Sequence, residues 1–286
     1  MNMHAPGTLI LDNLAPIGIH PNVDERKYHR WDGASNSRLG TIFEKSEGHL
    51  KAELDNPIEP TDDMIFGTAL HIATLEPDRL EERVVVEPDV NRRTNAGKEE
   101  LEVFRARNAG KIILSPTQWF NLIGARDAVF AHPWAARLID EASPADRELS
   151  LGWDDPETGV RVKARLDAIN RTGRAIVDVK KTKDASRRGF GKACANFGYH
   201  RQAALYSEAA EILGLIAGAD FVHIAVEGTY PFKVGVYCLD DEALSLGDEQ
   251  VHALLRRYAA AMESGEWPTS TGRIEPLALP KWAFYD

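Results

Sequence analysis

The chain has 286 residues, of which 43% are hydrophobic and 27% are charged, an ordinary composition for a soluble globular protein. Its net charge of −10 at pH 7 argues against a general nucleic-acid binder, and its two cysteines exclude a four-cysteine zinc or iron–sulfur site within the chain. No apolar run approaches the roughly 20 residues of a membrane span, and the N-terminus lacks the basic and apolar regions of a signal peptide. We therefore expect a cytoplasmic protein with no membrane partner.

The N-terminal half is predicted to be mainly helical, because apolar residues recur there at helical spacing between capping and breaking residues. Residues 1–22 contain three prolines and no clear period, so we interpret them as a loosely ordered arm. A short strand is expected over residues 83–86 and a mobile polar loop over residues 91–97. Helices are expected over residues 35–54, 62–76, 98–109 and 115–130, with a shorter one after His132 and Pro133.

From Arg147 the pattern changes to strands that alternate with helices. The expected elements are strands over residues 148–153, 162–169 and 174–181, helices over 187–196 and 199–215, strands over 221–226 and 233–239, and a helix over 241–263. No linker-like stretch separates the two halves, so we expect a single domain over residues 1–286. It would consist of a helical part at about 23–145, a mixed α/β (α+β) core at about 146–265 and a tail at 266–286.

The most specific pattern is a β-hairpin, in which Asn170 and Gly173 are turn residues between two alternating stretches. If the turn spans residues 170–173, Ile169 faces Arg174 and Asp167 faces Ile176. Strand side chains alternate between faces, so one face would be charged and the other apolar, as a core requires. The charged face would hold Lys163, Arg165, Asp167, Ile176, Asp178 and Lys180, and the apolar face Val162, Ala164, Leu166, Ala168, Ala175, Val177 and Val179.

Two carboxylates on that charged face, Asp167 and Asp178, would repel each other unless a cation lies between them. Oxygen-rich sites of this kind suit Mg²⁺ or Mn²⁺. Lys180 shares the face and could orient a water or stabilise charge on a phosphoryl group. The spacing alone is equally compatible with an exposed face that carries ordinary salt bridges.

Basic residues are concentrated around these carboxylates. Residues 161–192 contain 11 Lys or Arg and 3 Asp, a local charge of +8, so the remaining residues carry −18. Such a basic strip suits a phosphate-rich substrate, although a solvated basic face would give the same count. The candidate phosphate-binding residues are Lys163, Arg165, Lys181, Lys183, Arg187 and Arg188.

Two pairs of residues four apart share helix faces in the predicted helices. Gly67 and His71 form one pair, in which the glycine permits close approach of another backbone. Gln202 and Tyr206 form the other pair. A single helical histidine is more often structural than a ligand, so neither pair indicates a site alone.

Together, and in this order, these residues resemble the PD-(D/E)XK nuclease superfamily in its RecB-like branch. The resemblance is closer to the C-terminal nuclease domains of the exonuclease VIII (RecE) family and its phage relatives, and it covers most of the chain. The matching stretches are Tyr28-His29, Ala34-Ser35, FGTALHIATLEP at 66–77, GVRVKARLDAI at 159–169, VDVKKTKDAS at 177–186, GYHRQAALY at 198–206, and the WP and LPKW elements of the tail.

The resemblance implies a restriction-endonuclease-like core and a Mg²⁺-dependent exodeoxyribonuclease that acts on ends of double-stranded DNA. In such proteins a histidine, two carboxylates and a backbone carbonyl hold the metal, a lysine is catalytic, and a serine at a helix start lies near a terminal phosphate. Lys181 departs from the family, which often has threonine after the catalytic lysine. Carried over, the metal ligands are His71, Asp167, Asp178 and the Val179 carbonyl, the catalytic lysine is Lys180, Gln202 and Tyr206 complete the site, and Ser35 is the serine.

The resemblance also implies 5′→3′ digestion, a single-strand annealing protein as partner, and a toroidal homo-oligomer, most simply a tetramer, in the cytoplasm of a bacterial host. Two other readings of the same residues stay open. The chain could be a non-catalytic DNA-binding accessory protein, or an endonuclease or single-strand nuclease of the same fold. A zinc hydrolase fits less well, because only one histidine joins mostly oxygen ligands.

Overall fold

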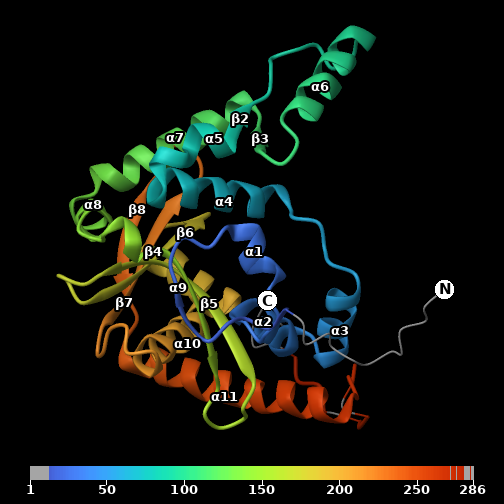
Figure 1. The fold of residues 1–286 in the computed structure, drawn as a ribbon, viewed down its shortest axis with the longest axis vertical. Coiled ribbons are helices and arrows are strands. Elements are labelled where there is room, and N and C mark those ends of the chain that lie inside the picture. The colour runs from blue at the N-terminus through green and yellow to red at the C-terminus, as the bar shows by residue number, and fades with distance from the viewer. Residues whose placement is uncertain (1–12, 271, 275, 280–283, 285–286) are drawn as a thin grey trace.

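The computed structural model describes residues 13–270, 272–274, 276–279 and 284 (Figure 1). Its centre is a mixed six-stranded sheet with the strand order β1-β4-β5-β6-β7-β8. Only β6 and β7 run parallel; the other neighbours are antiparallel. The predicted mixed α/β fold is thus confirmed. The strands are β1 (Gly18–His20), β4 (Arg147–Asp154), β5 (Arg161–Asn170), β6 (Ala175–Thr182), β7 (Asp220–Glu227) and β8 (Val234–Cys238).

Helices cover both faces of this sheet (Figure 1). The parallel pair β6 and β7 needs a crossover, and α9 (Arg187–Phe197) and α10 (Tyr199–Ile212) supply it. The long C-terminal helix α11 (Asp241–Ser264) packs against α10. Among the described residues, no helix is both long enough and apolar enough to cross a membrane.

The N-terminal half is mainly helical, as predicted. The helix expected over residues 35–54 is two helices, because Ser46 caps a new one by accepting the His49 N–H. β2 (Val84–Val86) and β3 (Ile112–Leu114) pair in parallel beside α6, which projects away from the body (Figure 1). The helices are α1 (Glu25–Arg30), α2 (Asn36–Glu44), α3 (Glu47–Asp55), α4 (Asp62–Leu75), α5 (Leu80–Arg83), α6 (Asn95–Arg107), α7 (Pro116–Ala131) and α8 (Pro133–Asp140), with short 3-10 turns at Pro77–Arg79 and Pro144–Asp146.

Two expectations for loops were wrong. The expected arm over residues 1–22 contributes β1, which pairs with β4 at the sheet edge; residues 1–12 of that arm lie outside the described residues. The expected loop over 91–97 ends early, because the Thr94 side chain caps α6 by accepting the Gly97 N–H. Part of the expected tail also lies outside the described residues.

The predicted hairpin is present, but its predicted pairing was wrong. Ile169 pairs with Ile176, and Asn170 pairs with Ala175, so the turn spans residues 171–174, and the partner of Ile169 lies two residues beyond the predicted Arg174. The Asn170 side chain stabilises this turn, because its Oδ1 accepts the Gly173 N–H at 2.6 Å. Asn170 therefore closes the ladder instead of lying within the turn.

The predicted apolar face does not stay on one side of the sheet. Leu166 packs in the core beneath α2, α10 and α11, whereas Ala168 packs in the core beneath α4, α7 and α8. Ile169 returns to the first core, so the alternation of β5 changes phase near Asp167. The β5–β6 ladder ends at the same place, and Asp167 Oδ2 accepts the Val179 N–H at 2.7 Å across the gap.

Candidate active site

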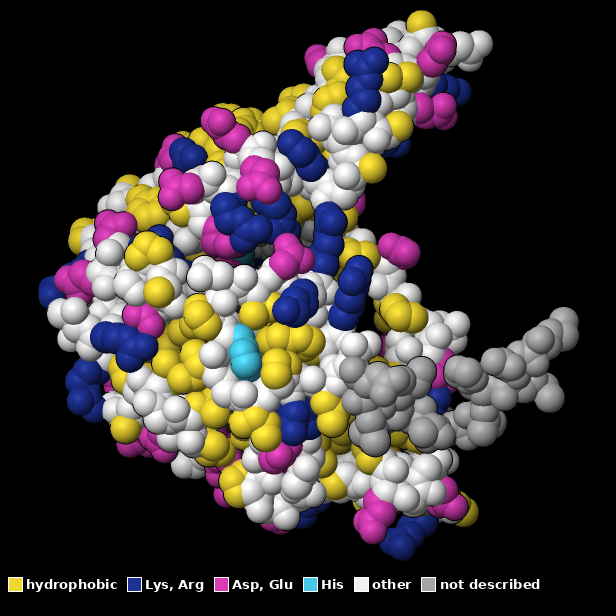
Figure 2. Space-filling view, viewed as in Figure 1, with side chains coloured by type: hydrophobic (Ala, Val, Ile, Leu, Met, Phe, Trp, Pro, Cys, Tyr) yellow, Lys and Arg dark blue, Asp and Glu magenta, His cyan; other side chains and the backbone are white. Residues whose placement is uncertain are grey.

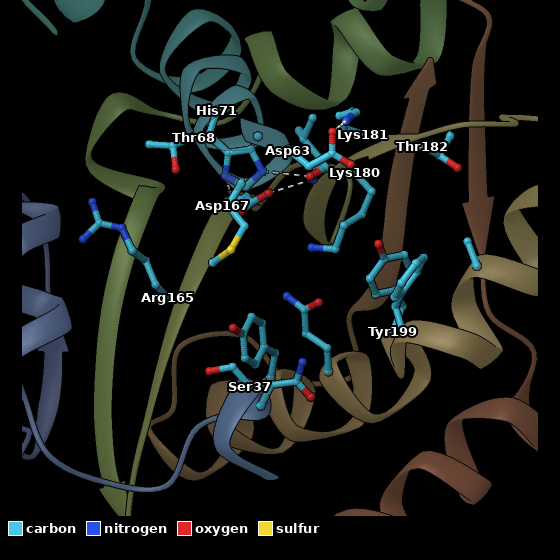
Figure 3. A pocket seen from close by; sticks show the side chains of 18 of the residues that line it. Ser37, Asp63, Thr68, His71, Arg165, Asp167, Lys180, Lys181, Thr182 and Tyr199 are labelled. Carbon is cyan, nitrogen blue, oxygen red and sulfur yellow. Dashed lines mark hydrogen bonds and ion pairs between the residues drawn. The ribbon is translucent and has the colours of Figure 1, made fainter. Parts of the chain in front are cut away.

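A cleft of ≈ 990 Å³ opens where β5 and β6 separate (Figure 3). Its walls come from β4, β5 and β6, from α1 and the start of α2, and from α4, α9 and α10. Segments that are far apart in the sequence therefore meet where the β5–β6 ladder ends. Figure 2 shows Lys and Arg side chains gathered near the middle of the viewed face, beside the notch below the projecting helix α6.

One cluster in this cleft consists of His71, Glu148 and Asp167, whose ligand atoms lie within 4.8 Å of one another. His71 Nδ1 is 3.6 Å from Asp167 Oδ1 and 3.8 Å from Glu148 Oε1. The other ring nitrogen, Nε2, is 2.9 Å from the Val179 carbonyl oxygen. Because a carbonyl only accepts, Nε2 carries the hydrogen and Nδ1 faces the two carboxylates.

The electrostatics of this cluster favour a bound cation. Burial raises the pKa of Asp167 to about 6; His71 opposes this rise, and the nearby Asp178 carboxylate adds to it. Burial lowers the pKa of His71, but the carboxylates of Asp167 and Glu148 outweigh it and raise that pKa. Two carboxylates, an imidazole and an adjacent backbone carbonyl are a donor set that suits a divalent metal ion. These residues therefore fit the metal ion that the family resemblance implies.

Asp178 has a different set of neighbours. Its Oδ1 accepts hydrogen bonds from Lys180 Nζ at 2.6 Å and Gln202 Nε2 at 2.9 Å, and its Oδ2 is 3.0 Å from His223 Nδ1. Burial opposes ionisation of Asp178, but Lys180 and then His223 hold its pKa well below the usual range. Asp178 is not in the three-residue cluster above, so its role as a metal ligand stays a prediction.

Lys180 interacts with both Asp178 and Asp167, and so links the Asp178 network to the metal-ligand cluster. Its Nζ lies 5.2 Å from the centre of the Tyr199 ring and over that ring, and its side chain is 16% exposed (Figure 3). Burial works against its charge, but Asp178 and Asp167 raise the pKa of this lysine. Lys180 is therefore a cation with restricted freedom at the wall of an open cleft.

The other predicted residues also line the cleft. Gln202 and Tyr206 lie on α10, one turn apart, and burial raises the pKa of Tyr206 well above its usual value. Ser35 is the N-cap of α2 and accepts the Arg38 N–H. The N-terminus of α2 is fixed at the cleft because the backbone of Ala34 bonds to β5 on both sides of Val162.

Sequence reasoning missed two residues of this site, Glu148 and His223. Arg147 pairs with Ala168 and Leu149 pairs with Leu166, so knowledge of the β4–β5 register would have placed Glu148 opposite Asp167. His223 is fully buried and pairs in register with Asp178 across the parallel β6–β7 ladder. Its signal was a single histidine within an apolar strand, which has no meaning until the strand order is known.

The basic residues divide into different environments. Lys181, Lys183 and Lys192 line the cleft, and Lys181 Nζ is 2.6 Å from Asp63 Oδ1. Arg165 also lines it, but its guanidinium donates to Glu148 and to the Val23 carbonyl. Arg187 and Arg188 are exposed at the start of α9 and do not line the cleft.

The basic strip is less continuous than its sequence suggests. Only six of its eleven cations line the cleft. Arg161 pairs with Asp154, and Arg171 pairs with Asp146, both away from the cleft. Some cations of residues 161–192 thus stabilise the β4–β5 and β5–β6 turns through these ion pairs.

Lys163 differs from the expected phosphate contact. It is only 5% exposed, and its Nζ donates to the carbonyls of Tyr28 at 3.1 Å and Trp31 at 2.6 Å. Burial, followed by the charge of Arg38, lowers the pKa of Lys163 to about 8. The structure therefore assigns Lys163 to holding the end of α1 against β5.

We expect Lys163→Met to destabilise the protein by about 2 kcal/mol, because two buried carbonyls would lose a charged donor. DNA affinity, measured with a metal chelator present, should not change in the folded variant. Lys183→Met is the matched control: Lys183 is exposed in the cleft, so its loss should weaken DNA binding and leave Tm unchanged. The reverse pattern in the two variants would return Lys163 to the predicted phosphate contacts.

The fold and this site are those of the PD-(D/E)XK nuclease superfamily. A family model described as a PDDEXK-like domain of unknown function (DUF3799) matches residues 35–280, and the chain belongs to this family. It is also similar to a solved structure from Eubacterium rectale described as a "Putative exonuclease", with a TM-score of 0.58 and 12% identity over 92% of this chain and 98% of that chain. At this identity the likeness shows a shared fold. A search of curated proteins finds no match.

Proposed function

We propose that the protein is a metal-dependent exodeoxyribonuclease that hydrolyses double-stranded DNA from its ends, most simply in the 5′→3′ direction. The observation that carries this proposal is the convergence of His71, Glu148, Asp167 and Lys180 in one open cleft, where buried Asp178 behind the wall holds the Lys180 ammonium. Carboxylates that hold a metal ion and a fixed ammonium are groups that suit metal-assisted phosphodiester hydrolysis.

The cleft residues would divide this work. His71, Glu148 and Asp167 would hold the metal, which we propose to be Mg²⁺ with Mn²⁺ as a substitute. When bound, such an ion supplies Lewis acidity at the phosphate and lowers the pKa of a water. Lys180, held by Asp178, would neutralise charge that develops on the phosphoryl group.

The remaining cleft residues would bind and position DNA. Lys181 and Lys183 provide positive charge on one wall, which suits the phosphate backbone. Ser35 and the α2 N-terminus also line the cleft and would receive a terminal phosphate, because the N–H groups of a helix start attract anions. Gln202 would act indirectly by orienting the Asp178 carboxylate.

Digestion of end-labelled linear duplex and of closed circular duplex tests this proposal. We expect Mg²⁺-dependent release of label from the linear DNA, no cut in the circle, and no product with a chelator. A 5′-label released early supports the 5′→3′ direction. Cleavage of the circle would indicate an endonuclease, preference for single strands a single-strand nuclease, and DNA binding without any cleavage a non-catalytic accessory protein.

Glu148→Gln tests the metal cluster. We expect the Mg²⁺ concentration for half-maximal cleavage to rise about tenfold or more, because the charge of one ligand is lost. Glu82→Gln, the same change at an exposed residue of α5, should have no effect on the metal requirement. If Glu148 serves only as the partner of Arg165, the variant will have a lower Tm and an unchanged Mg²⁺ titration.

We also propose that the protein works as a homo-oligomeric ring, most simply a tetramer, with a single-strand annealing protein in the cytoplasm of a bacterial host. The charge distribution supports a ring, because several basic clefts would surround the duplex and the acidic remainder would face outward. Light scattering tests the assembly, and digestion with excess unlabelled trap DNA tests processivity. A monomer in solution would contradict the ring. Rapid quenching by the trap would contradict processive digestion, which is the proposed purpose of the ring.

A further inference from the structure

A second group of metal-ligand side chains lies outside the cleft. The turn that joins β4 and β5 reaches across to α11, where Glu157 of the turn pairs with Arg256 (Figure 1). Asp155 of the same turn meets Glu208 of α10 and His252 of α11, and their ligand atoms lie within 4.8 Å of one another. None of these three residues lines the cleft.

Asp155 provides an independent sign of a missing partner. It is only 2% exposed, and its Oδ2 accepts both the backbone N–H and the hydroxyl of Thr158, at 2.7 and 2.6 Å. The other oxygen, Oδ1, is buried and has no hydrogen-bond partner among the described residues. A buried carboxylate oxygen left in this way is costly, so a ligand for it is expected.

The histidine is oriented as a ligand. His252 Nδ1 donates to the Asp248 backbone carbonyl at 3.0 Å, which leaves Nε2 facing Glu208 Oε1 at 3.6 Å. A backbone carbonyl bonded to the other ring nitrogen is the usual way in which proteins fix a metal-binding imidazole. The side chains of Glu208 and His252 are 22% and 27% exposed, so an ion and a water can reach the group from solvent.

The charges of the group also favour a cation. Asp155 and Glu208 bring two carboxylates together, with the imidazole of His252 beside them. Ligand atoms around a tetrahedral zinc ion lie about 3.4 Å apart, so closing the observed group requires shifts of about 1 Å. Such shifts are within reach of side-chain rotations in a partly exposed group.

We propose that Asp155, Glu208 and His252 form a second site for a divalent transition-metal ion of the zinc class, separate from the nuclease cleft. One imidazole nitrogen and two carboxylates are ligands that zinc accepts, and a water would complete four-fold coordination. The ion would fasten the β4–β5 turn to α10 and α11. Its role is therefore structural, and it does not depend on the proposed nuclease activity.

Zinc titration of the chelator-treated full chain tests the site. Asp167→Asn is used as the background, so that binding in the cleft is weakened, and calorimetry and thermal unfolding are the measurements. We expect about one equivalent of Zn²⁺ to bind and, at about 100 times Kd, to raise Tm by roughly 5 °C or more. Adding His252→Gln, or Glu208→Gln as a second variant, should abolish both effects.

Asp248→Asn is the matched control, because it removes one carboxylate charge from the same exposed face of α11 without removing a proposed ligand. It should retain both the equivalent of Zn²⁺ and the rise in Tm. The proposal is overturned if Zn²⁺ gives no shift in the Asp167→Asn background. It is also overturned if the shift is the same after His252→Gln and Glu208→Gln in variants that circular dichroism shows to be folded.

Discussion

Asp178→Asn is expected to lower the rate of DNA cleavage about 10³-fold or more while the protein stays folded. Asp178 is the centre of the charged network, with Lys180 and Gln202 bonded to one oxygen and His223 beside the other. Asparagine keeps the size of the side chain and can still accept from two donors through Oδ1. It removes the charge that holds the Lys180 ammonium. Single-turnover digestion of linear duplex at saturating Mg²⁺ measures the effect.

The matched control for this change is Asp154→Asn. Asp154 lies at the end of β4, where its carboxylate pairs with Arg161 and is 47% exposed. An exposed pair of this kind contributes little, so the control should cleave DNA at close to the parental rate. A folded Asp178→Asn protein that cleaves as fast as the control would show that Asp178 has no part in the chemistry.

Most helices and strands could be predicted because their signals are local. Capping residues mark the starts of α4, α7 and α11, where Thr61, Ser115 and Asp240 each accept a backbone N–H of the first turn. β5 and β6 were found from the alternation on each side of Asn170 and Gly173. The charged face of this hairpin and two helical spacings singled out candidate site residues, and the family resemblance supplied their proposed roles.

Pairing and strand order could not be predicted, because they depend on contacts between distant segments. The turn residues suggested a closing pair of Ile169 and Arg174. Because the Asn170 side chain bonds to the Gly173 N–H, the turn begins after Asn170, and Ile169 pairs with Ile176. Glu148 and His223 reach the site only through neighbouring strands of the sheet. No spacing within one segment contains that information.

Burial of charged side chains also limited what the sequence could predict about the substrate-binding surface. Charge counting treated every cation between residues 161 and 192 as a contributor to one surface. Lys163 instead binds backbone carbonyls in the interior, and Arg171 fixes the hairpin turn through Asp146 and the Leu215 carbonyl. A basic residue next to a turn or a helix end has such local acceptors available, so composition overstates the charge that a substrate meets.

Lys180→Ala is the change with the second largest expected effect. Because the lysine is proposed to act on charge that develops in the transition state, kcat should fall about 10²- to 10³-fold with little change in KM for DNA. The ammonium is fixed by Asp178 at 2.6 Å and by the Tyr199 ring, so the variant loses a positioned positive charge that a neutral water cannot supply. Steady-state digestion of linear duplex at saturating Mg²⁺ gives both constants.

Lys181→Ala is the comparison that separates chemistry from binding, since it removes the same group from the next residue of β6. Lys181 is paired with the exposed carboxylate of Asp63, and it lines the cleft without contacting Asp178. Its loss should raise KM for DNA, more strongly at low salt, and leave kcat unchanged, because a phosphate contact binds substrate and transition state alike. If Lys180→Ala shows that same pattern, with kcat retained at saturating DNA, Lys180 belongs to the DNA-binding surface and the site needs another source of positive charge.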